Sequence, residues 1–422
     1  MTEFKNKKIN IAVIGGGASG MTAALFASQN TNCEITLFER NEFVGKKLLS
    51  TGNGRCNLSN VSLKNIIDLD DYGYYFRGSA MSMVKDSLIR FGYDDLISFF
   101  KSIGISCIER DGYVYPRSNQ AASVRTAFEM ALNNKDNIKV ICNTKINKIE
   151  KNGNAYLIYY KKEKPLFFDK VIMCSGGNAY PKSGSDGTSF YLLDILGIPY
   201  NKMLPSLVEC HTKLLQNANG VRSSASIYLE VDEKIVSEKY FGELQINKNG
   251  ISGIVVFQVS GIAAKYISLG KSVYAIIDFL PDMKEVEIEA LLNHNLKLCK
   301  PDDDIELIFN TIIPNQLIRE VLDNANINSS LHVFDADDEI IYKIVKSLKY
   351  YKVKIDGVGD FDKAQCGTGG IDSNSLTPYF ELKAYPNLFV CGEIVDVDGI
   401  CGGYNLSWAF ISGAIAGMEA AK

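Results

Sequence analysis

The sequence predicts an α/β protein whose main domain is built on a parallel sheet and is split by a β-rich insert with a helical subdomain. Two observations at the ends of the chain lead to this fold class. A strand, a glycine turn and a helix come first, "INIAVIGGGASGMTAALFASQ". A late apolar strand near residue 388 leads into a second glycine turn and helix. Between them the pattern changes, so two distant segments must complete one domain.

Size and composition limit the function classes. The chain has 422 residues, 46% hydrophobic and 22% charged, which is typical of a globular protein of two or three domains. A net charge of −4 does not favour nucleic acid or anionic lipid as a partner. Ten cysteines without a C-x-x-C pair and three scattered histidines predict no disulfide framework and no metal site. The first residues lack an apolar signal core, so we expect a cytoplasmic address.

The first glycine turn has the spacing of a dinucleotide-binding motif. Gly15, Gly17 and Gly20 form G-x-G-x-x-G directly after a strand. The first glycine permits the tight turn, the second lets a pyrophosphate approach the backbone, and the third lets helix and strand pack closely. Ala18 and Ser19 open the helix, whose free N–H groups favour phosphate.

A second strand, "CEITLFER", ends in Glu39 and Arg40. Glu39 lies nineteen residues after Gly20, where an acid accepts hydrogen bonds from an adenosine ribose. Strand, motif, helix, strand and terminal acid together favour a dinucleotide site over a glycine-rich turn that binds nothing.

The segment after the second strand favours FAD over NAD. Residues 41–60, "NEFVGKKLLSTGNGRCNLSN", are glycine-rich, basic and without strand pattern. FAD is long, and its flavin end needs such a second loop. Lys46 and Lys47 either neutralise phosphate or flavin charge or belong to a solvated basic loop. The predicted flavin loop contains Asn53, Gly54, Arg55, Cys56 and Asn57.

The far end raises the question of a membrane anchor, because residues 399–418 carry no charge. A strand from Leu388 to Cys391 ends in Gly392 and Glu393, and a Gly402-Gly403 turn opens a helix from about Tyr404 to Ala421. Five glycines and the turn argue against a spanning helix. Burial against the first strand and a cofactor explains the missing charge better. Tyr404 and Asn405, at the helix start, are predicted to line the flavin, and no membrane partner is expected.

The middle of the chain predicts the domain organisation. We expect helices at 80–102 and 119–133, strands at 138–174, and a cofactor-side turn at Ser175, Gly176 and Gly177. From about 198 the pattern is β-rich, with "SASIYLEV", "KIVSEKY", "GELQI", "SGIVVFQVS" and "SVYAIIDFL" as the strand-like stretches. The predicted domains are 1–197 with 351–422 for the cofactor, 198–283 for the substrate and 284–350 as a helical subdomain. Oligomeric state is not readable.

The sequence resembles the BaiN-type, aminoacetone-oxidase-like family of FAD flavoproteins. The matching stretches are "GGGASG", "GKKLLSTGNGRCNLSN", "GYVYPRSNQAASV", "CSGGNAYPKSGSDG", "PSLVE", "GELQINKNGISG" and "GEIVDVDGICGGYNLSWAFISG". The resemblance implies a Rossmann-like FAD domain of the two-dinucleotide-fold type, with Glu393 in place of the acid that binds the ribityl chain. The pattern departs at Asn247, Ile254, Cys366 and Gly367, which leaves the family's substrates in doubt.

Catalytic candidates are few, because the flavin itself supplies the hard chemistry. Cys56 and Cys401 are either a redox pair or two buried thiols, and the second interpretation is preferred. Arg117, after Tyr115 in "GYVYPRS", either holds a substrate carboxylate or the flavin, or ends a structural turn. Tyr404 is the third candidate. His211 is more often a core or surface residue than a base.

We therefore expect an FAD-dependent oxidoreductase that transfers hydride through flavin N5 to or from a small organic substrate. An NAD(P)H-driven reductase of an enone or imine-like group is favoured, although no second G-x-G-x-x-G marks an NAD(P)H site. A flavin amine oxidase that uses oxygen is the first alternative. An FAD-dependent RNA-modifying or RNA-binding protein is the second, and the mildly acidic charge weighs against it.

Overall fold

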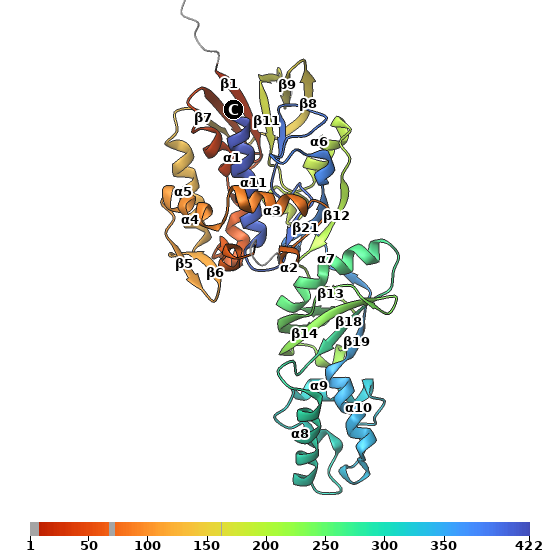
Figure 1. Ribbon diagram of the computed structural model, residues 1–422. Coiled ribbons are helices and arrows are strands. Elements are labelled where there is room, and N and C mark those ends of the chain that lie inside the picture. The colour runs from red at the N-terminus through yellow and green to blue at the C-terminus, as the bar shows by residue number, and fades with distance from the viewer. Residues whose placement is uncertain (1–7, 67–71, 162) are drawn as a thin grey trace, which may run out of the picture. The chain divides into compact units, whose positions relative to one another are not determined.

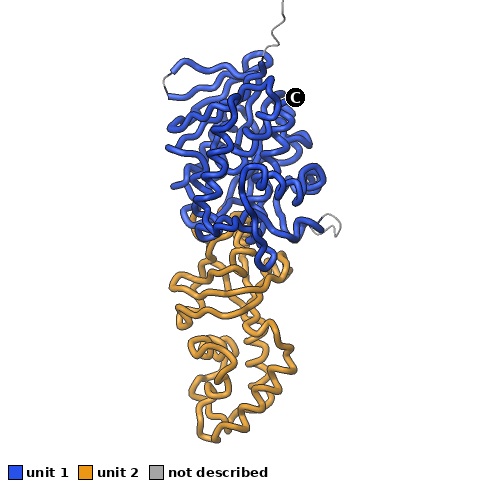
Figure 2. Tube along the Cα trace, turned by 90° about the vertical axis from the view of Figure 1, so that its left-hand side faces the viewer, with its two compact units in different colours: residues 1–204, 361–422 blue, residues 205–360 orange. Residues whose placement is uncertain are grey.

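The structure is a computed structural model that describes residues 8–66, 72–161 and 163–422. The sequence predicts that the first residues of the chain lack a signal core. Residues 1–7 of that segment lie outside the described residues. The chain divides into two compact units (Figure 2). Unit 1 comprises residues 1–204 and 361–422, and unit 2 comprises residues 205–360. The proposed roles of the stretches 198–283 and 284–350 as separate domains stay a prediction.

Unit 1 is built on a parallel sheet of five strands in the order β22-β11-β1-β2-β7 (Figure 1). The strands are β1 (Ile9–Ile14), β2 (Cys33–Phe38), β7 (Ile138–Ile141), β11 (Lys170–Met173) and β22 (Leu388–Val390). Apolar runs such as Ile11 to Ile14 are buried on both faces, as parallel strands require. The late strand β22 pairs with β11, so the last segment of the chain does complete the first domain.

Helices cover one face of this sheet, and two of them pack unusually close together. They are α1 (Ala18–Ala27), α5 (Ala121–Asn133) and α11 (Tyr404–Ala420), and α1 lies beside α11 (Figure 1). A Cβ on Gly413 of α11 would lie 2.4 Å from the Ser19 carbonyl oxygen, and one on Gly417 would lie 2.4 Å from that of Ala23. The two helix backbones therefore touch, and α11 is uncharged over most of its length because it is buried against α1 and the sheet.

The membrane alternative finds no support in the described part of the chain. There, no helix combines the length and the apolar character needed to cross a bilayer.

An antiparallel sheet covers the other face of the parallel sheet. Its order is β10-β9-β8, with β8 (Ile146–Asn152), β9 (Ala155–Tyr160) and β10 (Leu166–Phe168). Phe38 at the end of β2 contacts the rings of Tyr160 and Phe168 at centroid distances of 6.0 and 5.8 Å. Unit 1 thus has three layers: helices, parallel sheet and antiparallel sheet.

Unit 1 also contains several shorter elements outside these three layers. The 3-10 segments are η1 (Lys46–Gly54), η2 (Val61–Lys64), η3 (Pro181–Ser183) and η7 (Ser373–Ser375). The helices are α2 (Tyr72–Tyr75), α3 (Ser82–Arg90), α4 (Tyr93–Ser102) and α6 (Thr188–Leu196). The strands pair as β3 (Ser59–Asn60) and β5 (Cys107–Arg110) with β6 (Tyr113–Pro116), β4 (Phe76–Arg77) with β23 (Asp398–Gly399), and β12 (Asn201–Ser206) with β21 (Cys366–Gly370).

Unit 2 contains an antiparallel sheet in the order β19-β18-β14-β16-β17-β13-β20, with β15 beside β14. The strands are β13 (Cys210–His211), β14 (Arg222–Val231), β15 (Lys234–Ile235), β16 (Tyr240–Asn247), β17 (Gly250–Ser252), β18 (Val273–Asp278), β19 (Tyr351–Ile355) and β20 (Gly357–Val358). Helix α7 (Ile254–Ser268) contacts this sheet. The other helices are α8 (Glu285–Leu298), α9 (Asn315–Asn324) and α10 (Asp338–Lys349), with short segments η4 (Gln216–Ala218), η5 (Ile305–Phe309) and η6 (Val333–Asp335).

One strand-like stretch of the insert was predicted wrongly. "SGIVVFQVS" lies mainly in helix α7. Its valines, Val255, Val256 and Val259, are fully buried, and a short apolar run of this kind fits a buried helix as well as a buried strand. The helix contacts β14 and β16, and this tertiary packing outweighs the strand preference of β-branched residues.

Candidate functional site

The glycine motif lies where β1 passes into α1. A Cβ on Gly20 would lie 1.8 Å from the Gly15 carbonyl oxygen, so this contact between turn and helix admits glycine alone. Gly17 is different, because a Cβ there would meet no atom within 4 Å. Its φ of −78° suits any residue. The open space beside Gly17, at the start of α1, fits a ligand that approaches the backbone.

Glu39 connects the end of β2 to the glycine turn. Its Oε2 accepts a hydrogen bond from the Gly16 N–H at 2.7 Å, and its Oε1 accepts from the backbone N–H and the side-chain amide of Asn41, both at 2.7 Å. The side chain is buried. The two bonds from Asn41 use both lone pairs of Oε1, whereas Oε2 keeps one, so the carboxylate can still accept one of the ribose hydroxyls that the sequence predicts.

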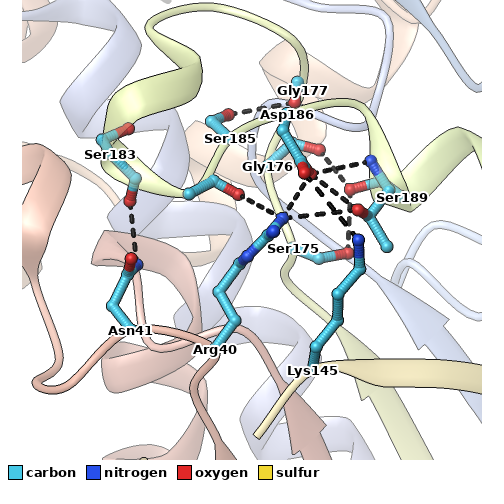
Figure 3. Close-up of polar contacts among 12 residues, drawn as sticks. Arg40, Asn41, Lys145, Ser175, Gly176, Gly177, Ser183, Ser185, Asp186 and Ser189 are labelled. Carbon is cyan, nitrogen blue, oxygen red and sulfur yellow. Dashed lines mark hydrogen bonds and ion pairs between the residues drawn. The ribbon is translucent and has the colours of Figure 1, made fainter. Parts of the chain in front are cut away.

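A charged cluster holds the loop before α6 against the end of β2 (Figure 3). Arg40 forms an ion pair with Asp186, and its Nη1 donates to the Gly184 carbonyl and the Thr188 hydroxyl, each at 3.3 Å. Lys145 Nζ lies 3.8 Å from the Asp186 carboxylate. Burial alone would raise the pKa of Asp186, but hydrogen bonds from Thr188 and Arg40 outweigh it and lower this pKa to about 2. Arg40 is thereby engaged in positioning the loop.

Serine hydroxyls connect the same loop to the turn after β11. Ser189 Oγ donates to the Gly176 carbonyl at 2.7 Å and to Ser175 Oγ at 2.9 Å. Ser185 Oγ donates to the Gly177 carbonyl at 3.0 Å (Figure 3). The Ser185 and Ser189 side chains therefore hold the predicted cofactor-side turn at residues 175–177 in place.

The predicted flavin loop has an unusual backbone. Asn53 and Cys56 have φ angles of +53° and +60°, and the glycines between residues 52 and 54 are also left-handed. Left-handed residues other than glycine are uncommon and occur often at functional sites. Asn57, which follows, has a buried Oδ1 that accepts no hydrogen bond from the residues that the structure describes. An orphaned buried acceptor of this kind fits a loop that is completed by a ligand.

Glu393 ties three segments together at the end of β22. Its Oε2 accepts from Lys47 Nζ at 2.8 Å and from the Gly177 N–H at 3.2 Å, and its Oε1 accepts from the Gly367 N–H at 3.0 Å. Lys46, the other predicted cation, instead donates to the Asn41 side chain at 3.4 Å.

The start of α11 is surrounded by aromatic side chains. The Gly402-Gly403 turn precedes Tyr404, whose hydroxyl lies 2.8 Å from Ser62 Oγ. Tyr75 packs against the Tyr404 ring at 5.0 Å. Burial raises the pKa of the Tyr404 phenol well above its usual range, so it is neutral at physiological pH. The Asn405 side chain closes the preceding turn by bonding the Gly399 N–H and carbonyl.

Two catalytic candidates have environments that oppose a chemical role. Burial raises the pKa of Cys56 to about 12, despite a hydrogen bond with Thr51, so its reactive thiolate is scarce. Neither Cys56 nor Cys401 forms a disulfide within the described residues. Arg117 is exposed and donates to Ser106 Oγ at 3.4 Å, as expected of an arginine that ends a structural turn.

His211 belongs to unit 2. It lies on β13, half-exposed, with its Nε2 3.6 Å from the Glu209 carboxylate.

Sequence reasoning missed a pair of buried thiols in unit 1. Cys174 and Cys391 follow the last residues of β11 and β22, and their Sγ atoms lie 3.2 Å apart. Burial, together with the neighbouring thiol, raises the pKa of Cys174 well above its usual range. Both residues precede glycine turns, but the strand order that makes them neighbours cannot be read from the sequence.

Fold and site together define a dinucleotide-binding flavoprotein of the FAD type. The fit rests on the open space at Gly17, the free lone pair of Glu39 Oε2 and the orphaned Asn57 acceptor. The chain belongs to the HI0933-like family, since the model of the HI0933-like protein Rossmann domain matches residues 9–419.

Full-length relatives agree with this family. The 3-dehydro-bile acid delta(4,6)-reductase of Clostridium scindens is 33% identical over 98% of this chain and 99% of its own. The ribosomal RNA dihydrouridine synthase of Escherichia coli is 23% identical over 96% of both chains. Among solved structures, the match to the 3-ketosteroid delta1-dehydrogenase of Sterolibacterium denitrificans covers 99% of this chain and 100% of that chain, with 11% sequence identity and a TM-score of 0.51.

These findings confirm the predicted fold class, the family and the general activity. The protein is an FAD-dependent oxidoreductase with a Rossmann-type cofactor domain. The individual cofactor-contacting residues, the electron donor and the substrate stay predictions.

Proposed function

We propose that this protein is an NAD(P)H-driven, FAD-dependent reductase that saturates a carbon–carbon double bond conjugated to a carbonyl group in a small cytoplasmic molecule. One observation carries the proposal. Two relatives that match nearly the whole chain have unrelated substrates, a 3-dehydro-bile acid and ribosomal RNA. Their names nevertheless describe one kind of chemistry, the reduction of an alkene activated by a neighbouring carbonyl. The fold would keep this chemistry while the substrate changes.

Unit 1 contributes the cofactor site. The residues that would hold FAD are those predicted from the sequence: the glycine motif with Ala18 and Ser19, Glu39, the loop from Lys46 to Asn57, Gly176, Glu393 and the Gly402–Asn405 turn. When bound, FAD supplies the capacity to accept two electrons from one partner and deliver them to another. The protein contributes phosphate binding at the start of α1 and a positive helix end at α11.

Tyr404 is the residue best suited to supply a proton. Reduction of an activated alkene needs a proton donor beside the α-carbon, and the donor must be neutral until it acts. The Tyr404 phenol is held neutral by burial, and the Ser62 hydroxyl at 2.8 Å can pass it a replacement proton.

The charge of unit 2 supports a small molecule over RNA. Residues 205–360 contain 16 Lys and Arg against 23 Asp and Glu, a net charge of −7, while the rest of the chain carries +3. The stretch 284–350 alone carries −6. A polyanion gains its affinity mainly from cations on the protein. Reduction of an RNA base is therefore the second candidate, and the relatives named ribosomal RNA dihydrouridine synthases favour it.

The thiols support the cytoplasmic location that the sequence predicts. All ten cysteines lie in the described residues and none forms a disulfide there, as is usual for proteins of a reducing compartment where NAD(P)H is also available.

An anaerobic experiment tests the proposal. The yellow protein is mixed with NADH or NADPH in a stopped-flow instrument, and bleaching of the flavin absorption is followed. We expect bleaching at rates of about 1 per second or faster with one of the two nucleotides. Addition of a simple cyclic enone should then restore the colour, while the saturated ketone should not. Bulk tRNA serves as a third acceptor.

Each outcome points to one function. No bleaching with FAD retained would overturn the NAD(P)H-driven reductase, and rapid recolouring in air with peroxide release after an amine is added would establish the oxidase alternative. Bleaching that only RNA reverses would establish the second candidate.

A further inference from the structure

Lys47 and Glu393 form an isolated charge pair in the described part of unit 1. The Lys47 ammonium has one carboxylate partner there, the Glu393 Oε2 at 2.8 Å. The side chains are 28% and 19% exposed, so water screens the pair only in part. Two backbone N–H groups, of Gly177 and Gly367, complete the hydrogen bonding of the carboxylate.

The carboxylate is held in place by close packing as well as by hydrogen bonds. A Cβ on Gly177 would lie 3.3 Å from the Glu393 carboxyl carbon and 2.5 Å from Met203 Sδ, so the turn backbone lies directly against both side chains. A Cβ on Gly367 would also lie 2.4 Å from the Met203 sulfur. Glu393 therefore cannot turn away from Lys47 without moving the turn or β21. The charges are fixed at one place in the fold.

The strand order places this pair on the flavin side of the cofactor site. β1, which carries the phosphate-binding turn, lies between β2 and β11. Glu39, the predicted ribose acceptor, ends β2 on one side. Glu393 follows β22, which lies beyond β11 on the other side. An extended dinucleotide at the carboxyl ends of the strands has its adenosine toward β2, so its other end lies toward β11 and β22.

We propose that Lys47 and Glu393 are positioning residues that set the reduction potential of bound FAD through their balanced charges. The inference depends on FAD binding and not on the proposed reduction of conjugated alkenes. Reduction of FAD at neutral pH adds two electrons and fewer than two protons, so it adds negative charge to the flavin. A nearby positive charge favours that change, and a nearby negative charge opposes it. The pair keeps the local charge close to zero.

The two single variants therefore have effects of opposite sign. Lys47→Met leaves the carboxylate alone and should lower the midpoint potential. Glu393→Gln leaves the ammonium alone and should raise it. We expect each to change the ratio of reduced to oxidised flavin at a fixed poise by about tenfold, which corresponds to about 30 mV for a two-electron couple. The double variant should lie within about threefold of the unmodified protein.

The measurement is an anaerobic redox titration of the FAD-loaded protein with a reference dye, in excess FAD. Lys47→Arg is the charge-conserving control and should stay within about threefold. Lys145→Met is the charge control outside the predicted cofactor residues: it removes the same charge where the ammonium lies 3.8 Å from the Asp186 carboxylate. It should shift the potential by less than a third of the Lys47→Met effect.

If Lys47 and Glu393 only stabilise the fold, their variants should give a different pattern of effects. Both single variants would then lower FAD retention and melting temperature together, and their potentials would agree. Shifts of the same sign, or of less than threefold in both, overturn the proposal. If Glu393→Gln does not fold, Lys47→Met must still lower the potential while Lys47→Arg does not, and failure of that comparison also overturns it.

Discussion

The two units of this protein differ in what constrains their sequences. In unit 1, side chains, glycines and helix ends converge on the carboxyl ends of five parallel strands, and each predicted cofactor motif lies there. In unit 2, an antiparallel sheet with its helices carries a net charge of −7 and two of the positions that depart from the family pattern, Asn247 and Ile254. Asn247 closes a strand connection by accepting from the Asn249 N–H at 3.0 Å, and Ile254 begins α7 half-exposed. The other two departures, Cys366 and Gly367, lie in β21 of unit 1, so the units differ in backbone constraint and in charge, and not in whether their side chains depart from the family pattern.

The largest effects should come from the glycine motif. Gly20→Ala places a methyl group 1.8 Å from a carbonyl oxygen, so α1 must leave the turn. We expect a loss of more than about 4 kcal/mol in the free energy of unfolding, or no folded protein at all. Thermal unfolding and soluble yield measure it.

Gly17→Ala is the matched control, because it separates an effect on folding stability from an effect on FAD binding. The added methyl group meets no atom within 4 Å, so the melting temperature of the FAD-free protein should change by no more than about 1 °C. If the pyrophosphate approaches this backbone, FAD affinity should fall by at least about tenfold. Unchanged FAD affinity would show that the pyrophosphate does not approach the backbone at Gly17.

The next largest effect should be catalytic. Tyr404→Phe removes the phenolic proton but keeps the ring that packs against Tyr75. Under the proposed function, reoxidation of the flavin by an enone should slow by about 100-fold. Reduction of the flavin by NAD(P)H needs no such donor and should change less than about twofold.

Ser62→Ala provides the graded control for this experiment. It removes the hydroxyl that lies 2.8 Å from Tyr404, and a slowing of about tenfold is expected because water can replace the relay. Equal slowing of both half-reactions in Tyr404→Phe would mean that the phenol positions the cofactor and donates no proton.

Local motifs could be predicted from the sequence because their geometry is local. The G-x-G-x-x-G turn, the acid after β2 and the turn before α11 each depend on residues a few positions apart. The helix at 119–133 was found as α5 (Ala121–Asn133), and the stretch at 80–102 proved to be two helices, α3 and α4, separated by Phe91 and Gly92.

Contacts that depend on strand order could not be predicted. Cys174 and Cys391 are 217 residues apart in the chain and meet only because β11 and β22 are neighbours. The partners of Glu393 come from three separate segments for the same reason. The helix α7 was mistaken for a strand because its apolar run is short and its period cannot be read without knowing which faces are buried.

A smaller effect, on the free energy of unfolding, is expected for the cluster of Arg40, Lys145 and Asp186 that holds the loop before α6. The pKa of Asp186 is about 2 in the folded protein, below the value of about 3.9 usual for an unfolded chain. A lowered pKa means that the ionised group stabilises the fold above pH 4, and this stabilisation is lost as the pH falls from about 4 toward 2. Asp186→Asn should therefore lower the free energy of unfolding by about 1 kcal/mol at pH 7, since partial exposure screens the pair.

Urea unfolding at pH 7, 5, 4 and 3 checks this dependence. The difference between the two proteins should be constant from pH 7 to 5 and should narrow at pH 3. Lys145→Met, which removes the cation at 3.8 Å, should have less than half the effect at pH 7. A difference that is the same at every pH would show that the variant changes packing and not an ionised pair.

The smallest effect is expected for the two cysteines near the predicted flavin site. A redox pair requires a thiolate that can attack its partner, and burial raises the pKa of Cys56 to about 12. Serine conserves the shape and the hydrogen bond with Thr51. Cys56→Ser, Cys401→Ser and the double variant should therefore reduce and reoxidise their flavin within about twofold of the unmodified rate. A large and equal loss in both single variants, with FAD retained, would instead establish the disulfide chemistry that the environment of Cys56 opposes.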